Sequence, residues 1–164
     1  MINLFVWSGP RNISTALMRS FENRRDTKVY DEPFYAYYLK KTNLNHPMKD
    51  EIINHYHTNE DEVINLITKE DNKYKIFYQK HMTHHVLDKD YSWINSLTNC
   101  FLIRNPIFVV KSFFKSWDKG NFEDIGFSQQ YSIFKYVQGN INSRPIVIDA
   151  SKLRNNPKKV LQAV

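Results

Sequence analysis

Residues 2–21 read INLFVWSGPRNISTALMRSF, which is an apolar run, a short loop and an amphipathic segment. Residues 2–7 are almost continuously apolar, which is typical of a strand buried on both faces of a parallel sheet. Residues 14–23 place small and apolar side chains at the spacing of one helical face. A strand that passes through a tight loop into a helix is the opening unit expected of an α/β fold.

The rest of the chain continues this alternation of strand-like and helix-like segments. Short apolar runs predict further strands at residues 28–30, 75–79, 100–104 and 145–149, and three- and four-residue spacing predicts helices at residues 50–69 and 106–117. Pro106 suits the first turn of a helix. The alternation predicts a three-layer α/β fold with a parallel sheet.

Composition limits the classes of protein to consider. The 164 residues suit one compact domain, and the formal net charge of +6 favours an anionic ligand. The single cysteine, Cys100, excludes an internal disulfide framework and a multi-cysteine zinc site. The basic residues form no stripe that predicts nucleic-acid binding, and no run approaches the roughly 18 apolar residues of a membrane span. Neither a nucleic-acid nor a membrane partner is expected, and the expected compartment is the cytoplasm.

The end of the chain carries a further expectation. Residues 156–161 begin an amphipathic helix, and the sequence stops at Val164. A parallel sheet normally covers its last strand with a full helix. We therefore expect residues 1–164 to be a single nucleotide-binding domain that is incomplete at its C-terminus, with nothing covering the last strand.

The loop from Ser8 to Thr15 is a candidate phosphate site. A loop between a strand and a helix offers free backbone N–H groups and the positive end of the helix dipole. Arg11 adds a planar cation, and Ser14 and Thr15 add hydroxyl donors. The alternative interpretation is an ordinary helix start with Ser14 as the N-cap residue.

This loop differs from the P-loop pattern GxxxxGK[ST]. Gly9 occupies the first glycine, but Ser14, Thr15 and Ala16 stand where glycine, lysine and a hydroxyl residue are required. The lysine that reaches the terminal phosphates and the hydroxyl that binds magnesium are therefore missing. This pattern disfavours an enzyme that uses Mg–ATP or Mg–GTP.

A second candidate anion site follows the strand at residues 100–104. Arg104 ends that strand, and Ser112 lies about two turns into the next helix. The carboxyl ends of parallel strands are where ligands bind in open α/β sheets. Both side chains are thus candidates for a second phosphate. The alternative is a surface ion pair at Arg104 and a small packing residue at Ser112.

Taken together, the loop and the Arg-x7-Ser element resemble the sulfotransferase superfamily, whose members use 3′-phosphoadenosine 5′-phosphosulfate (PAPS). WSGPRNISTALMRSF at residues 7–21 and DEPFY at residues 31–35 are similar to a bacterial sulfotransferase-like subfamily. The resemblance assigns Arg104 and Ser112 to the 3′-phosphate. It assigns the 5′-phosphosulfate to Arg11, Asn12, Ile13, Ser14 and Thr15.

The resemblance also implies a fold and an activity. It implies a sheet of the P-loop nucleoside-kinase type with strand order 2-3-1-4-5, and transfer of a sulfuryl group without a metal to a hydroxyl or amine of a small-molecule acceptor. Arg11 replaces the lysine common in the family, and Ile13 stands where many relatives have glycine. From the resemblance we also expect residues 1–164 to lack the family's C-terminal region. The oligomeric state stays open, and so do two alternatives: another P-loop-like nucleotide enzyme, and a nucleotide-binding module without catalysis.

The resemblance implies that Arg11 would stabilise charge on the leaving phosphate. It also suggests two candidates for the catalytic base. Glu32 follows the short second strand, and His81 follows the third; different family branches place a catalytic glutamate or histidine there. Glu32 is preferred because its motif is the more distinctive. The alternatives are a capping or ion-paired carboxylate at Glu32 and a hydrogen-bonded loop histidine at His81.

The histidines around residue 84 invite comparison with a metal site. In a helix, His81 and His85 would share a face, as in zinc-binding helices. No glutamate follows His81 as in HExxH, and the further ligands are unspecified. No metal is expected, and His84 and His85 are interpreted as acceptor-pocket or surface residues.

Overall fold

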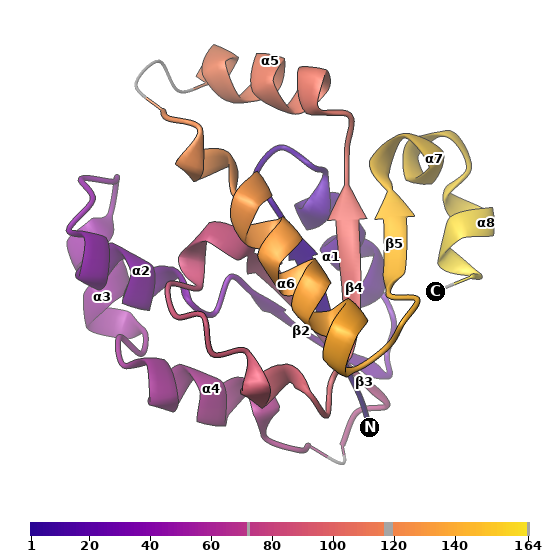
Figure 1. Cartoon of the computed structure of the whole chain (residues 1–164). Helices are drawn as coiled ribbons and strands as arrows, with labels where there is room; N and C mark the ends of the chain where they lie inside the picture. Colours follow the sequence, from indigo (N-terminus) through magenta and orange to yellow (C-terminus); the bar gives the residue numbers. More distant parts are fainter. Residues whose placement is uncertain (72, 117–119, 164) are drawn as a thin grey trace.

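The computed structural model describes residues 1–71, 73–116 and 120–163, and it is an α/β structure (Figure 1). Five strands form one sheet in the order β2-β3-β1-β4-β5, and all neighbouring pairs are parallel. The predicted parallel sheet and its strand order are confirmed. The strands are β1 Ile2–Ser8, β2 Thr27–Asp31, β3 Ile76–Met82, β4 Thr98–Ile103 and β5 Ile146–Asp149.

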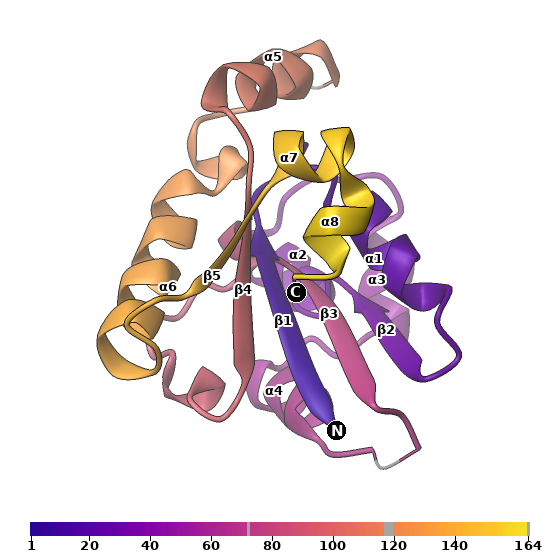
Figure 2. The same cartoon turned by 90° about the vertical axis from the view of Figure 1, so that its right-hand side faces the viewer.

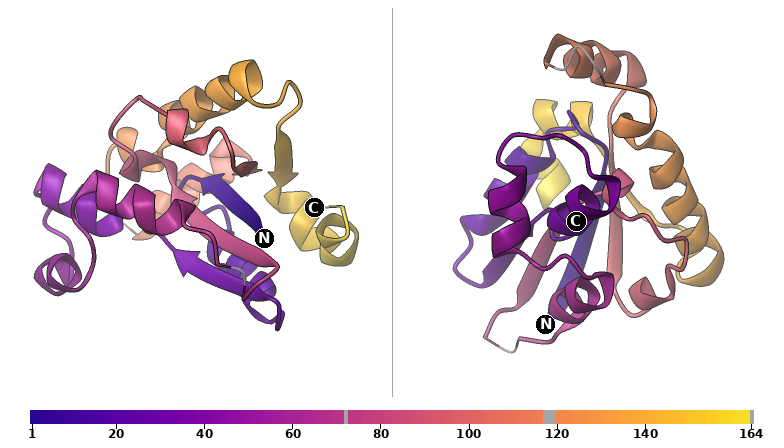
Figure 3. Two further views of the ribbon diagram at one scale, coloured as in Figure 1. Left: turned by 90° about the horizontal axis from the view of Figure 1, so that it is seen from below. Right: turned by 90° about the vertical axis from the view of Figure 1, so that its left-hand side faces the viewer.

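Helices cover both faces of this sheet. Figure 2 shows α6 on one side of the strands and α7 and α8 on the other. In the left view of Figure 3, α2, α3 and α4 (purple to magenta) lie away from α7 and α8 (yellow). The helices are α1 Ser14–Glu22, α2 Tyr35–Thr42, α3 Lys49–His55, α4 Glu60–Thr68, α5 Pro106–Ser116, α6 Phe127–Asn140, α7 Ala150–Asn155 and α8 Pro157–Leu161, with short 3-10 turns η1 Thr83–His85, η2 Ser92–Ile94 and η3 Glu123–Ile125. The described residues include no helix that is both long enough and apolar enough to cross a membrane.

The alternation of side chains along β1 explains why helices cover both faces of the sheet. Phe5 and Trp7 are buried with side chains of α2, α4 and α6, whereas Leu4 and Val6 are buried with side chains of α1 and α7. A central strand that is apolar on both faces needs a cover on each. The strand predicted at residues 2–7 to be buried on both faces is therefore confirmed, and so is the three-layer architecture predicted from the alternation of strands and helices.

The predicted helix at residues 50–69 is wrong as one continuous element. α3 ends at His55, and α4 begins at Glu60 after Asn59, whose side chain accepts a hydrogen bond from the backbone N–H of Glu62. This N-cap starts a new helix and leaves Tyr56 in the link between the two. The predicted helix at residues 106–117 is α5, and Trp117 lies outside the described residues.

The expectation that nothing covers the last strand is also wrong on one face. α7 follows β5 directly, and Ala150 and Leu153 are buried in the same cluster as Ile148. Val160 and Leu161 of α8 pack against that cluster. The Asp149 side chain caps α7 by accepting hydrogen bonds from the N–H groups of the next turn, so β5 ends where this helix begins.

Candidate functional site

The candidate site lies at the carboxyl edge of the sheet. Parallel pairing places Ser8 beside Met82, and Asp31 beside Lys80, so the loops that follow these strands leave the sheet together. α5 lies beyond this edge rather than on a face of the sheet (Figure 1). Polar residues that are far apart in the chain are thereby brought to one place.

Residues 9–13 belong to the candidate phosphate site and are called the phosphate loop below; they adopt an uncommon backbone. A Cβ atom at Gly9 would lie 2.3 Å from the carbonyl oxygen of Ile125, so only glycine fits there. Arg11 and Ile13 have φ angles of 64° and 59°, in the left-handed region that a β-branched residue rarely adopts. Glycine adopts this conformation at little cost. The Ile13 backbone is therefore held in a glycine-like conformation by its surroundings.

The N-terminus of α1 faces the site without a side-chain cap. Ile13 occupies the N-cap position and makes no capping hydrogen bond from its side chain, and Ser14 is the first helical residue. The alternative interpretation of Ser14 as N-cap is therefore wrong. The N–H groups of a helix's first turn have no partner within the helix and suit an anion.

Two hydrogen bonds join the two candidate anion elements. Arg11 donates from Nε to Oγ of Ser112 at 2.9 Å, and Arg104 donates from Nη1 to the carbonyl oxygen of Arg11 at 2.7 Å. The structure thus brings Arg11, Arg104 and Ser112 together. The phosphate loop and the start of α5 form one cationic site.

These residues surround a cavity of about 420 Å³, named here the loop cavity. The side chain of Asn12 is not among its walls: Asn12 is only 1% exposed, and its amide has no hydrogen-bond partner within the described residues. The structure therefore does not bring Asn12 to this cavity. The lining residues include Arg11, Ile13, Ser14, Thr15, Glu32, Lys80, Arg104 and Ser112.

Glu32 is fixed at the rim of the loop cavity by backbone and side-chain contacts. Its backbone has a φ angle of 49°, and its N–H donates to the carbonyl oxygen of Lys80 at 2.9 Å. Lys80 Nζ donates to Glu32 Oε1 at 2.5 Å and to Asp31 Oδ1 at 2.7 Å. On the other side, His85 Nδ1 lies 4.0 Å from Glu32 Oε2. Lys80 is only 3% exposed, so this lysine acts as a buried clamp on two carboxylates.

Sequence reasoning missed Lys80 as a site residue. The predicted strand stopped at Gln79, whereas β3 continues to Met82. In the parallel register Lys80 pairs with Asp31, which is the residue before Glu32. Once the strand register is known, a lysine beside an Asp-Glu pair on the neighbouring strand predicts these ion pairs.

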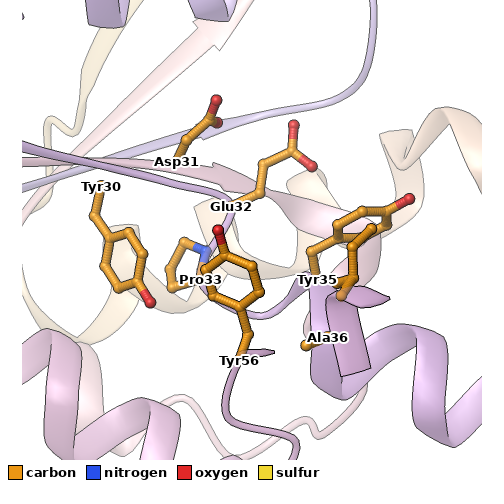
Figure 4. Close-up of a pocket in the computed structure, with 8 residues that line it drawn as sticks. Tyr30, Asp31, Glu32, Pro33, Tyr35, Ala36 and Tyr56 are labelled. Carbon is orange, nitrogen blue, oxygen red and sulfur yellow. The ribbon is translucent and has the colours of Figure 1, made fainter. Parts of the chain in front are cut away.

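A second cavity of about 360 Å³ adjoins Glu32, and we name it the tyrosine cavity. In Figure 4 the carboxylates of Asp31 and Glu32 point to the same side, away from the Tyr30 ring. Glu32 lines both cavities, and it therefore separates a cationic compartment from an aromatic one. The walls of the tyrosine cavity are Tyr30, Asp31, Glu32, Pro33, Tyr35, Ala36, Ile52 and Tyr56.

The structure does not bring His81 to either cavity. Its ring packs with centroids 4.4 Å from Phe5 and 4.7 Å from Trp7, and it is 1% exposed. Burial lowers the pKa of His81 to about 3, so the imidazole is neutral near pH 7. Neither ring nitrogen has a hydrogen-bond partner in the part of the chain that the structure describes. The alternative of a hydrogen-bonded loop histidine is likewise wrong, because His81 lies inside β3.

His84 and His85 lie in the turn η1 after β3 rather than on a helix with His81. The zinc-helix spacing therefore has no structural counterpart. The described ranges contain no group of three or more histidine, cysteine, aspartate or glutamate side chains placed to hold a metal ion. The ring of His85 stacks against Tyr35 and Tyr38, with centroids 5.0 and 4.8 Å apart, and so supports the wall of the tyrosine cavity.

Comparison with known proteins identifies the family. The family model described as a sulfotransferase domain matches residues 2–164. The chain belongs to the sulfotransferase domain family. The resemblance carried by the phosphate loop and by the DEPFY segment is thus confirmed at the level of the family.

Solved structures agree with the fold of this sulfotransferase domain. A sulfotransferase from Alicyclobacillus acidocaldarius superposes with a TM-score of 0.64 at 9% identity, covering 99% of this chain and 78% of that one. The sulfotransferase domain of the Synechococcus PCC 7002 olefin synthase gives 0.63 at 15% identity, covering 98% and 70%. Shikimate kinase from Bacteroides thetaiotaomicron gives 0.53 at 9% identity, covering 99% and 97%. The predicted P-loop kinase type of fold is confirmed.

Two curated relatives from Arabidopsis thaliana are more similar in sequence. Branched-chain-amino-acid aminotransferase-like protein 1 is 35% identical over 159 residues, and protein 2 is 32% identical over 162 residues. These matches cover 96% and 98% of this sulfotransferase domain, but only 28% and 29% of the respective relatives. The domain therefore spans less than a third of the length of these proteins. Their names refer to the whole, longer chains.

Proposed function

We propose that this sulfotransferase domain binds PAPS in the loop cavity and transfers its sulfuryl group to a hydroxyl or amine of a small acceptor. The observation that carries the proposal is the pair of hydrogen bonds from Arg11 to Ser112 and from Arg104 to Arg11. They join two anion-binding elements, as a nucleotide with phosphate groups at both its 5′ and 3′ positions requires.

The chemistry of the donor groups fits such a ligand. Arg11, Ser14 and Thr15, with the first-turn N–H groups of α1, suit the 5′-phosphosulfate, and Arg104 and Ser112 suit the 3′-phosphate. A further cavity of about 240 Å³ adjoins at Arg104. Its walls add a second arginine and an aromatic ring, through Arg154 and Phe108. Positive charge therefore continues beyond the loop cavity toward the last turn of α7.

The proposed transfer is an in-line displacement at sulfur. The acceptor oxygen or nitrogen forms a bond to sulfur, and the bond between sulfur and the bridging oxygen of the 5′-phosphosulfate breaks. That oxygen keeps the electron pair, which produces adenosine 3′,5′-bisphosphate and a sulfated acceptor. Arg11 and the loop N–H groups stabilise the charge that develops on the leaving phosphate. The acceptor's proton passes to the base.

We assign the base to Glu32. Its carboxylate lies at the border of the loop cavity and the tyrosine cavity, so it can meet an acceptor next to the donor. Lys80 holds one carboxylate oxygen and leaves the other on the side of His85. Lys80 is thus a positioning residue for the base. His81 is not assigned this role because its ring lies in the core.

Calorimetry with nucleotides tests the proposal. Adenosine 3′,5′-bisphosphate should bind at least about tenfold tighter than AMP or ATP, and a chelator should leave its affinity unchanged. Equal affinity for AMP and its 3′-phosphorylated form would overturn the assignment of Arg104 and Ser112. Tighter binding of ATP with magnesium would favour another nucleotide enzyme. Nucleotide binding without transfer to any acceptor in a broad panel would favour a binding module.

A further inference from the structure

The tyrosine cavity differs in chemistry from the loop cavity, and this difference has a consequence for the acceptor. We infer that it selects phenol-type acceptors that are uncharged or carry an amine, and that it discriminates against anionic and carbohydrate acceptors. The inference rests on the proposed function, because it names the acceptor class of the same site.

The size and the walls suit a flat apolar molecule. At about 360 Å³ the cavity is near the lower end of the range for small-ligand pockets. Tyr30, Tyr35 and Tyr56 supply aromatic rings to its lining, and Ile52 adds an aliphatic surface. Aromatic rings pack favourably on other rings in stacked or edge-on arrangements. A single ring with a short substituent fits this space.

The charge disfavours an anion. Of the residues that the structure describes, none that lines this cavity is a lysine or an arginine, whereas Asp31 and Glu32 both line it. Lys80 lies behind these two carboxylates and is bonded to both. The three side chains together carry one net negative charge. An anionic acceptor would therefore meet repulsion, and an amine would meet attraction.

The position of the cavity brings the acceptor's hydroxyl to the base. Glu32 forms part of both cavities, so a phenol that lies among the tyrosine rings directs its oxygen toward the Glu32 carboxylate. Tyr56 comes from the link between α3 and α4, and Figure 4 shows its hydroxyl directed toward Pro33 and Glu32. Tyr56 is 56% exposed, so its ring is a wall that can be changed without disturbing the core.

A matched set of probes tests the acceptor class by binding alone. The set is 4-ethylphenol, tyramine, 4-hydroxyphenylacetate and methyl β-glucoside, measured by NMR titration of the whole chain with and without adenosine 3′,5′-bisphosphate. The three phenols share one ring and differ mainly in charge. We expect 4-ethylphenol and tyramine to bind at least about tenfold tighter than 4-hydroxyphenylacetate. The glucoside should bind more weakly than 4-ethylphenol.

Substitutions locate this binding. Tyr56→Ala should weaken binding of 4-ethylphenol by about three- to tenfold, and Tyr56→Phe should retain it. Tyr131→Ala is the matched control, because Tyr131 is 65% exposed on α6 and does not line the tyrosine cavity. Asp31→Asn should reduce the discrimination against 4-hydroxyphenylacetate.

The outcomes separate this inference from the proposed function. If 4-hydroxyphenylacetate or the glucoside binds as tightly as 4-ethylphenol, the acceptor class is wrong. If Tyr56→Ala changes affinity no more than Tyr131→Ala, the binding site is wrong. Failure of adenosine 3′,5′-bisphosphate to bind would instead overturn the proposed function, while the order of the phenols is still measured without a nucleotide.

Discussion

Arg11 donates a hydrogen bond from Nε to Oγ of Ser112, a residue that lies 101 positions later in the chain. The guanidinium can make this bond and still present its Nη groups to a ligand, because its donors are fixed in a planar fork. A lysine has a single nitrogen, which would have to serve both partners. Arginine, rather than the lysine common in the family, is therefore the residue that suits the contact with Ser112 of α5.

Arg11→Lys should weaken binding of AMP by about tenfold, because the fork that serves Ser112 and the 5′-phosphate together is lost. Calorimetry measures the change. Arg25→Lys is the control, since Arg25 is an exposed arginine outside the lining of the loop cavity. If both variants bind AMP like the parent protein, Arg11 does not contact the nucleotide.

Arg104→Ala should weaken binding of adenosine 3′,5′-bisphosphate by about 1.5–3 kcal/mol, the scale of hydrogen bonds to charged groups. AMP should lose less affinity, through the lost contact between Arg104 and the Arg11 carbonyl oxygen. The ratio of the two losses is the quantity to measure, with the exposed Arg144→Ala as control. Equal losses for both ligands would mean that Arg104 only supports the loop.

Glu32→Gln keeps the shape of the side chain and removes its basicity. Transfer should slow by about 10²–10⁴-fold while the affinity for adenosine 3′,5′-bisphosphate changes little. Glu51→Gln, at an exposed position of α3, is the matched control. Unchanged transfer in the Glu32 variant would remove this residue from the mechanism.

Lys80→Met should lower the free energy of unfolding by about 1–3 kcal/mol, because Asp31 and Glu32 lose their shared partner. The double variant Lys80→Met/Glu32→Gln should lose less than the sum of the single losses, since it no longer leaves two carboxylates unpaired. Urea unfolding of the parent and the three variants measures this coupling. Additive losses would show that the ion pair contributes nothing specific.

The buried His81 should make stability depend on pH. Its pKa in the folded chain is about 3, against 6.5 as the ordinary value, so below pH 6.5 the unfolded chain binds a proton that the folded chain does not. Stability is therefore lost as the pH falls from about 6.5, by up to about 1.4 kcal/mol per pH unit for this residue. His84, with a pKa lowered by burial to about 4, adds a loss of the same sign.

His81→Phe tests the pH effect, because a phenylalanine suits the packing against Phe5 and Trp7 and does not titrate. From pH 7 to pH 4.5, the midpoint of urea unfolding should fall less in this variant than in the parent protein. The same fall in both proteins would show that His81 does not contribute.

The sheet and the phosphate loop could be predicted because their signals are local. A nearly continuous apolar run predicts a strand buried on both faces, and the loop after it can bind anions through its position alone. The meeting of Arg11 with Arg104 depends instead on the strand order, which only the resemblance to the sulfotransferase superfamily implied. β1 and β4 are neighbours, so the loops that follow them leave the same edge of the sheet.

The parts that were missed depend on contacts between segments. The six residues of α7 are too few for a helical period, and an N-cap at Asn59 starts a second helix within what otherwise reads as one helix at residues 50–69. His81 was expected in a loop because the end of β3 falls three residues later than its apolar run. The clamp of Lys80 on Glu32 and the place of Tyr56 in a cavity wall depend on register and on tertiary packing, which composition and spacing do not encode.

The break between α3 and α4 bears on how this domain can change over evolution. Tyr56 lies in that break, which is attached to the sheet only through helices, whereas Arg11, Glu32 and Lys80 lie on strands or directly after them. Substitutions and insertions in the break reshape one wall of the tyrosine cavity and leave the strand pairing intact. The segment can therefore be exchanged as a unit in directed evolution, with the loop cavity kept constant as the inherited part.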